Sequence, residues 1–329
     1  MNAEEIHEGY DRYTMERFEF EYGRVLENVC VEYSLTGTPK FDEDGNIVNA
    51  IVYCHPYGGN YVSVNNLFEI TKNGSSFDKN DYFFISITSL GVPDSCCPSI
   101  TGLNHNFPAY SIKDAVNFKR QFLKEKLGIE RVHGILARGF GGYEAYTWSC
   151  EYPDEMDFLI IHSSAFKTSG YRYVLAKCMD SILGSYDELY GESYEESLSK
   201  VMVSVNSLLY STYFSKRIFQ EMSNDEIDVL MDDFIDDGLF MDIYDLKFTN
   251  DSIINYNVED KLENIKAKVL IISSKKDIYY SPEYDSVPVK DMIKDSEVVL
   301  YDFVRKNAND DDYSYFEDDL KEFMSQFKK

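Results

Sequence analysis

Short runs of uninterrupted apolar residues, separated by stretches of helical periodicity, constrain the fold of this chain more than any other feature. The runs are NAIVYCH (49–55), DYFFISITSL (81–90), VHGILA (132–137), FLIIHSS (158–164), KAKVLIISS (266–274) and SEVVLYDF (296–303). Strands with apolar residues at successive positions are buried on both faces, which is typical of a central parallel sheet. Their alternation with helices indicates βαβ units. We therefore expect an α/β protein with a mostly parallel central sheet flanked by helices.

The segments around these strands carry their own signals. Alternating apolar and polar residues from Arg17 to Gly37 predict a hairpin of half-buried edge strands. Ser111 is a candidate N-cap with Asp114 three residues later, and an apolar stripe follows until Gly128. Further helices are expected over about 142–150 and at the C-terminus, over 315–327.

The region from 166 to 250 lacks strand patterns and has helical periodicity with many acidic residues. We interpret it as a helical lid inserted into one core domain, whose two parts are residues 1–165 and 251–329. Apolar residues recur at helical spacing within the insertion and must be buried there: Val201, Met202, Val205, Leu208 and Leu209.

Composition excludes several functional classes. The 329 residues carry 58 acidic and 32 basic side chains, a net charge of −26, and no basic stripe that would bind nucleic acid or an anionic membrane surface. The N-terminus lacks the pattern of a signal peptide, and no apolar run is long enough to span a membrane. Six scattered cysteines form no disulfide framework or C-x-x-C pair. We expect a cytoplasmic protein without a structural metal.

The turn Ala137–Gly142 follows one predicted strand and opens a helix, which is where an α/β-hydrolase places its G-x-S-x-G nucleophile elbow. The residues around it resemble the homoserine O-acetyltransferase family, whose pattern is Gly-Gly-Ser-Met-Gly-Gly followed by a Trp-containing helix. The matching residues here are Gly141, Gly142, Ala145, Trp148, Tyr152, Pro153 and Asp154. Further matches occur in order along nearly the whole chain, at 55–59, 81–84, 90–91, 107–108, 112–114, 257–258, 262–266 and 269–272, and at Asp277 and Pro282.

This resemblance implies an α/β-hydrolase fold with a catalytic triad of which one member remains. The family's nucleophilic serine aligns with Gly139, and its acid aligns with Asp277. The general-base histidine falls within 307–312, approximately at Asp311, and no histidine follows His162. The resemblance also assigns an oxyanion loop and pocket to His55, Tyr57, Gly58, Gly59, Arg138, Phe140 and Gly141.

Loss of the nucleophile or the base alone costs a serine-triad enzyme on the order of a millionfold in kcat. The backbone N–H groups of Tyr57 and Phe140 do not depend on side-chain identity, so an oxyanion hole can remain. In serine proteases that lack a triad member, such groups together with substrate binding still accelerate the reaction roughly 10³- to 10⁴-fold over the reaction in water. The glycine itself has a structural explanation, because it occupies the backbone conformation of an elbow without steric cost.

Other candidate sites carry weaker signals. Gly139-x-Gly141 imitates part of a dinucleotide fingerprint, but Glu144 stands at the third glycine position. The acidic run 310–312 lacks the ligand spacing of a calcium loop and is interpreted as a solvated loop. Neighbouring strand residues point to opposite faces, so His162 and Ser163 are not expected to form a nucleophile pair, and Cys54 beside His55 fails for the same reason.

Two hypotheses follow. The first is a non-catalytic homologue of homoserine O-acetyltransferase, a pseudoenzyme that acts as a binding or regulatory protein without a cofactor. Its partner would be a small molecule, either an acyl-CoA or an amino-acid alcohol, or an active paralogue. The resemblance also implies a homodimer through the lid. The second hypothesis is an active acyltransferase or esterase that uses non-standard catalytic residues. A third class, a purely structural subunit, would bind neither acetyl-CoA nor homoserine in its pocket.

Overall fold

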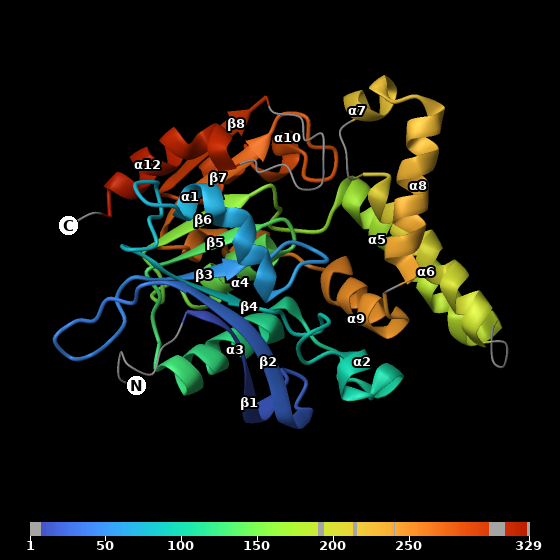
Figure 1. Cartoon of the computed structure of the whole chain (residues 1–329), viewed down its shortest axis with the longest axis horizontal. Coiled ribbons are helices and arrows are strands. Elements are labelled where there is room, and N and C mark those ends of the chain that lie inside the picture. The colour runs from blue at the N-terminus through green and yellow to red at the C-terminus, as the bar shows by residue number, and fades with distance from the viewer. Residues whose placement is uncertain (1–7, 190–193, 213–215, 240, 303–312, 328–329) are drawn as a thin grey trace.

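The computed structural model describes residues 8–189, 194–212, 216–239, 241–302 and 313–327. Eight strands form one sheet in the order β1-β2-β4-β3-β5-β6-β7-β8 (Figure 1). Their bounds are Gly9–Glu19, Val25–Gly37, Ala50–Cys54, Phe83–Ile87, Gly134–Arg138, Phe158–His162, Lys268–Ser274 and Ser296–Tyr301 for β1 to β8. Strands β3 to β8 pair in parallel, as predicted. The successive apolar residues of β3 to β7 are buried between helical layers, whereas those of the edge strand β8 are only half-buried.

The N-terminal hairpin is longer than the sequence pattern indicated. Strand β1 begins at Gly9 rather than near Arg17, and it pairs with β2 in antiparallel register. Its first half shows little alternation in burial, with Tyr10 78% exposed, so the hydrophobic pattern could not mark where the strand starts. Strand β2 then pairs antiparallel with β4, which places the hairpin at the edge of the sheet, as expected.

Helices cover both faces of the sheet. Helices α3 (Ile112–Phe122) and α4 (Gly141–Glu151) pack in the core on one face, while α12 (Glu317–Ser325) and α1 (Phe68–Thr71) pack on the other (Figure 1). Ser111 and Asp114 form the predicted capping box of α3, and Gly128 ends the helical segment with a φ of +68°. The last turn before Gly128, Leu123–Leu127, is π-helical.

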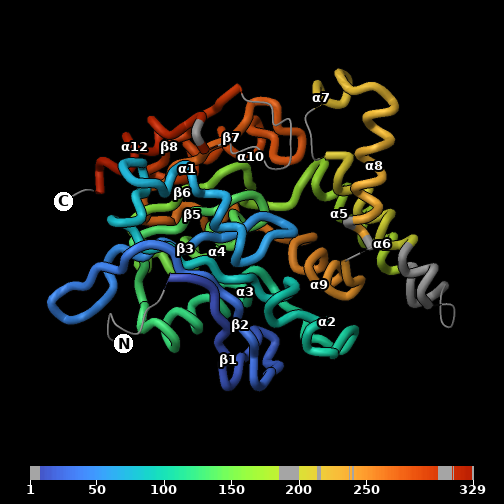
Figure 2. The backbone as a smooth tube through the Cα atoms, in the orientation of Figure 1, coloured from blue at the N-terminus to red at the C-terminus, as the bar shows by residue number. Residues whose placement is uncertain are grey.

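Among the described residues, five α-helices lie between β6 and β7 in the chain: α5 (Gly170–Leu189), α6 (Tyr194–Tyr210), α7 (Lys216–Glu221), α8 (Asn224–Leu239) and α9 (Ile243–Ile254). They stand beside the end of the sheet, with α9 next to α2 (Pro98–Thr101) (Figure 2). A separate cluster of buried side chains holds α5, α6 and α9 together: Met179, Leu183, Val201, Met202, Val205, Ile243 and Leu246. We call α5 to α9 the lid.

The parallel register brings several loops to the same edge of the sheet. Cys54 at the end of β3 pairs with Ala137 on β5, Arg138 pairs with His162 on β6, and His162 pairs with Ile272 on β7. The carboxyl ends of these four strands therefore open toward one place, which is where open α/β sheets bind ligands. Two further short helices, α10 (Pro282–Asp285) and α11 (Val289–Met292), follow β7.

Candidate functional site

The predicted elbow is present, and its central position has no side chain. Gly139 lies between β5 and α4 with a φ of +53°, in the left-handed region that favours glycine. Its N–H donates to the carbonyl of His162 at 3.0 Å, and its carbonyl accepts from the N–H of Gly142 at 3.0 Å and from the Ser164 hydroxyl at 2.6 Å. The turn thus has the geometry of a strand-to-helix elbow without a nucleophile.

The next two glycines allow a close approach of backbones. A Cβ atom on Gly141 would lie 2.1 Å from the carbonyl oxygen of Cys54, and one on Gly142 would lie 2.1 Å from the Ser164 hydroxyl. No side chain fits at either position without displacing β3 or the segment after β6. These glycines therefore hold the N-terminus of α4 against the carboxyl ends of the strands.

His55 anchors the loop 55–59 after β3. Its Nδ1 lies 2.9 Å from the carbonyl of Pro56, and its Nε2 lies 3.1 Å from the backbone N of Ser89. The Ser89 N–H must donate to Nε2, so Nδ1 carries the proton and donates to Pro56. Burial and the nearby Lys119 charge lower the pKa of His55 to about 4. The imidazole is thus neutral and fully engaged in holding the loop.

A buried ion pair between α3 and α4 is connected to this loop through Ser89. Lys119 on α3 and Glu144 on α4 are both fully buried, with 2.5 Å between their charged atoms. The Ser89 hydroxyl donates to the same Glu144 carboxylate at 2.5 Å. Burial alone would raise the pKa of Glu144, but the Lys119 charge lowers it, so the carboxylate stays ionised. Helices α3 and α4 are thereby linked through Ser89 to His55.

Two residues that line the space above the elbow have backbone N–H groups available to a ligand. Within the described ranges, the N–H groups of Tyr57 and Phe140 donate no hydrogen bond to another residue, and both residues line the pocket described below. Phe140 is the N-cap residue of α4, where the helix dipole presents partial positive charge. This pair has the chemistry of an oxyanion hole, because unpaired N–H groups stabilise a negatively charged oxygen.

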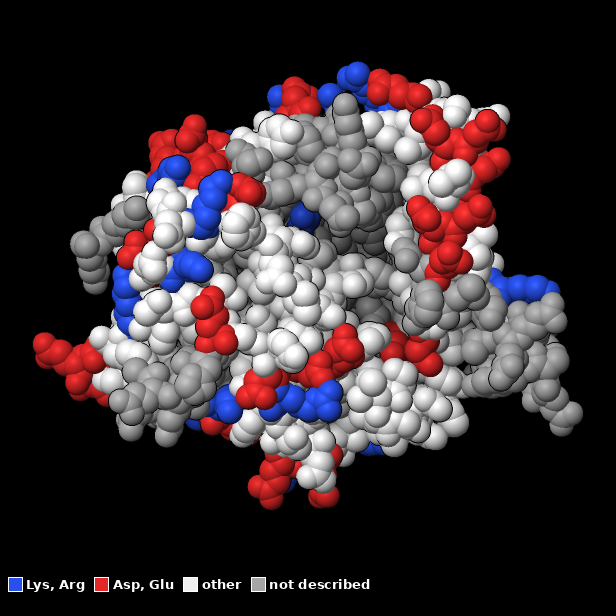
Figure 3. Space-filling model, viewed as in Figure 1, with Lys and Arg blue, Asp and Glu red and all other residues white. Residues whose placement is uncertain are grey.

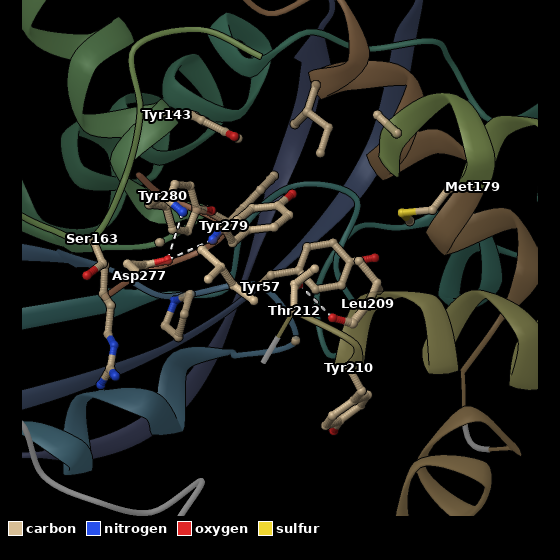
Figure 4. A pocket seen from close by; sticks show the side chains of 18 of the residues that line it. Tyr57, Tyr143, Ser163, Met179, Leu209, Tyr210, Thr212, Asp277, Tyr279 and Tyr280 are labelled. Carbon is tan, nitrogen blue, oxygen red and sulfur yellow. Dashed lines mark hydrogen bonds between the residues drawn. The ribbon is translucent and has the colours of Figure 1, made fainter. Parts of the chain in front are cut away.

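The carboxylate of Asp277, the expected triad acid, accepts hydrogen bonds from the turn that follows it. Its Oδ1 accepts from the backbone N–H groups of Tyr279 at 2.9 Å and Tyr280 at 2.8 Å (Figure 4). The neighbouring Ser163 hydroxyl helps to lower the pKa of this carboxyl group. Burial raises the pKa of Asp277, and these hydrogen bonds oppose the rise only in part. The carboxylate therefore caps a turn, a role that needs no catalysis.

The expected base position, Asp311, lies outside the described residues together with the rest of 307–312. No histidine lines the pocket above Gly139 that the described residues form. His162 approaches the hydroxyl of Tyr301 at 2.8 Å through its Nε2, and His133 pairs with Asp157 on the far end of β5. Both ring nitrogens of His55 already form the hydrogen bonds that hold its loop. The described part of the site thus brings no imidazole to the elbow.

Ser163 is a pocket residue that sequence reasoning did not select. It follows β6 with a φ of +46°, a left-handed conformation that is uncommon for any residue other than glycine. It lies beside Asp277 in the wall of the pocket (Figure 4). His162 turns instead toward Tyr301, so the two neighbours do not form a pair. The sequence carries no signal for the backbone conformation of Ser163.

A pocket of about 320 Å³ opens above Gly139. Its floor comes from the strand ends and is polar, with Arg138, Ser163, Ser274, Lys276 and Asp277. Its roof comes from the lid and is mostly apolar. The full lining is Pro56, Tyr57, Gly58, Arg138, Gly139, Phe140, Tyr143, Ser163, Ala176, Met179, Asn206, Leu209, Tyr210, Thr212, Met241, Asn250, Ile253, Ser274, Lys276, Asp277, Ile278, Tyr279, Tyr280 and Tyr301.

The remaining sequence candidates gain no support from their surroundings. Glu144, at the third glycine position of a dinucleotide fingerprint, is buried in an ion pair. Burial raises the pKa of Cys54 to about 12, which leaves the thiol unreactive. The described residues contain no cluster of three or more potential metal ligands. None of the described helices has both the length and the apolar character that crossing a membrane requires.

Comparisons with known proteins agree with this architecture. A protein named probable acyltransferase from Methanothermobacter thermautotrophicus is 37% identical over 300 residues, which cover 91% of this chain and 92% of that one. A homoserine O-succinyltransferase from Acinetobacter baylyi is 24% identical over 312 residues, covering 85% and 76% of the two chains. The crystal structure of homoserine O-acetyltransferase from Bacillus anthracis superimposes with a TM-score of 0.78 at 19% identity, covering 96% and 97%. No protein-family model matches the chain.

Proposed function

Because the chain belongs to the family of the probable acyltransferase from Methanothermobacter thermautotrophicus and has the α/β-hydrolase fold, we propose that it is a non-catalytic homologue of homoserine O-acetyltransferase that binds a small acyl compound or amino-acid alcohol. A single observation carries the proposal: the pocket stays open above Gly139, where the nucleophile would stand. A pocket without a nucleophile can bind a ligand and leave it unchanged.

Binding and turnover must be measured on the same preparation. Acetyl-CoA and homoserine are titrated against the full chain by calorimetry, and transfer of the acetyl group between them is followed in parallel. We expect binding of at least one compound without O-acetylhomoserine formation. Turnover at the rate of an ordinary enzyme, or no binding of either compound, would contradict the proposal.

A binding protein of this kind acts through a partner, and we propose an active paralogue or a second copy of the chain joined through the lid. Size-exclusion chromatography with light scattering, with and without acetyl-CoA, measures self-association directly. A dimer that persists at micromolar concentration supports the second copy. A strictly monomeric chain would leave the active paralogue as the proposed partner. Co-purification of the chain with that purified active enzyme tests this interaction.

Ser163 favours a second candidate function, an esterase or acyltransferase with a non-standard nucleophile. A side chain held in a strained backbone conformation beside a half-buried carboxylate in a pocket is a feature of active sites. In this scheme the Ser163 Oγ bonds to the acyl carbonyl carbon and its proton passes to Asp277. The C–O or C–S bond to the alcohol or thiol then breaks, and the leaving group takes that proton.

A fluorophosphonate probe separates the two candidates. Stoichiometric labelling of the wild-type protein that disappears in Ser163→Ala would establish the second candidate. Ser164→Ala is the matched control, since Ser164 is buried and donates to the Gly139 carbonyl rather than facing the pocket. Absence of labelling in all three proteins supports the non-catalytic proposal.

A further inference from the structure

The floor of the pocket presents donors and positive charge to a ligand but little that would accept a proton from it. Tyr57 and Phe140, whose backbone N–H groups donate to no described residue, line this pocket, and so do the cationic residues Arg138 and Lys276. Asp277 is the negatively charged residue among those that line the floor, and its carboxylate already accepts two backbone hydrogen bonds. Outside the lining, the Asp302 carboxylate lies 3.5 Å from the Lys276 ammonium group. The residues that line the floor therefore match an anionic ligand better than a neutral one.

The N-terminus of α4 adds to this preference. The helix has 11 residues, and the acidic residue in its first turn, Glu144, is directed to Lys119 instead of the pocket. The hydroxyl of Tyr143, in the same first turn, is buried without a hydrogen-bond partner in the described structure and points toward the pocket (Figure 4). A buried hydroxyl left unpaired costs stability, so a ligand acceptor explains it.

The missing serine side chain leaves room for a second oxygen. A Cβ atom placed on Gly139 would lie 3.6 Å from the Cβ of Pro56 and 3.8 Å from the ring of Tyr280, both ordinary contact distances. The space can therefore hold one further atom about the size of a methyl group. An ester or thioester needs one oxygen in the oxyanion hole, whereas a carboxylate has two, and the second needs this space.

We propose that the pocket is a site for a short-chain aliphatic carboxylate, with the carboxylate over Gly139 and the N-terminus of α4 and the alkyl chain under the lid. The apolar part of the roof suits the alkyl chain: Ala176, Met179, Leu209, Met241 and Ile253. The roof also holds Asn206 and Asn250, whose buried amide oxygens have no partner among the described residues. The inference rests on the proposed function and specifies its ligand as the free acid rather than the ester. The glycine is then a determinant of binding and not only the trace of a lost nucleophile.

Three probes that share the butyryl group test the ligand class by calorimetry on the full chain: butyrate, its isosteric amide butyramide, and ethyl butyrate. We expect butyrate to bind at least about tenfold more tightly than the other two, a difference that corresponds to about 1.4 kcal/mol. Equal affinity for butyrate and butyramide would overturn the proposal, because the negative charge would then contribute nothing.

Variants test the position of the carboxylate. Gly139→Ser fills the proposed second-oxygen space and should weaken butyrate binding about tenfold or more. Gly128→Ala is the control for backbone strain, because Gly128 also has a positive φ, +68°, and a Cβ atom there meets no other atom within 4 Å. Lys276→Gln removes a pocket charge without touching the elbow, and it should weaken butyrate binding but not butyramide binding. Unchanged butyrate affinity in both pocket variants would overturn the assignment.

The three probes also separate this inference from the proposed function. Binding of ethyl butyrate without binding of butyrate refutes the carboxylate site and leaves an acyl-compound pocket. Failure of all three probes, together with failure of acetyl-CoA and homoserine, refutes both.

Discussion

Gly139 shows how one residue combines a loss of chemistry with a gain in stability. Its backbone has a φ of +53°, which costs a residue with a side chain about 1–3 kcal/mol, while glycine adopts it freely. The neighbouring atoms leave ordinary contact distances for a Cβ atom, so the cost of a serine there is one of backbone strain rather than collision.

Gly139→Ser is therefore expected to fold with a free energy of unfolding lower by about 1–2 kcal/mol, measured by urea denaturation. It should not restore ester hydrolysis, because the described site supplies no imidazole to accept the serine proton. Hydrolysis of p-nitrophenyl acetate at a rate typical of serine esterases would show that a base is present after all.

Asp277 is a residue whose persistence has a structural reason. Burial raises its pKa above the ordinary value, so the folded state binds the proton more tightly than the unfolded state does. That contribution to stability is present at low pH and is lost as the pH rises through the folded-state pKa. The wild-type protein should thus gain stability relative to Asp277→Asn as the pH falls.

The comparison is made by urea denaturation of both proteins at pH 8 and pH 5. Asparagine keeps an acceptor oxygen for the Tyr279 and Tyr280 N–H groups, so the turn is preserved in the variant. A wild-type protein that gains no stability relative to the variant between pH 8 and pH 5 would contradict a pKa of Asp277 raised into this range.

At the scale of elements, the sequence was sufficient where burial follows a simple period. The strands β3 to β8 were predicted from their continuous apolar runs, and α3 was predicted from its capping box and its closing glycine. The start of β1 could not be predicted, because the residues in its first half are mostly exposed and show no alternation of apolar and polar side chains. The conformation of Ser163 depends on tertiary packing and leaves no local signal.

The link between the lid and the pocket is another feature that only the fold reveals. Arg172 on α5 forms two hydrogen bonds with Asp285 on α10, at 2.5 and 2.6 Å, across 113 residues of sequence. The same guanidinium donates to the carbonyl of Tyr279 at 2.8 Å, in the turn that surrounds Asp277. Both charged side chains are buried, so the pair fixes the first lid helix to the pocket wall.

Arg172→Met should lower the free energy of unfolding by about 3–5 kcal/mol, because it leaves the Asp285 carboxylate buried without a countercharge. Adding Asp285→Asn should restore part of that loss. The control is Arg217→Met, which breaks an exposed pair with Glu221 on α7 and should change little. The interpretation fails if Arg172→Met is no more destabilising than Arg217→Met in urea denaturation.

At the scale of the whole molecule, acidic side chains outnumber basic ones and give a net charge of −26. Acidic side chains run along α8 at the outer side of the lid (Figure 3), and the exposed ones are Asp225, Glu226, Asp228, Asp232, Asp233 and Asp236. Salt weakens surface ion pairs, each of which contributes about 0–1 kcal/mol, and it also weakens repulsion among the excess acidic groups. Because 58 acidic side chains outnumber 32 basic ones, we expect repulsion among the acidic groups to outweigh the attraction within ion pairs.

The melting temperature should therefore rise with salt. Between about 0.01 M and 0.1 M NaCl the screening length falls from about 30 Å to about 10 Å, which removes repulsion between charges on different elements and leaves contact pairs largely intact. A triple variant, Asp232→Asn with Asp233→Asn and Asp236→Asn, should melt at a higher temperature than the wild type in low salt and depend less on salt. A melting temperature that falls as NaCl is added, measured by calorimetry on both proteins, would mean that ion pairs rather than excess charge dominate the surface.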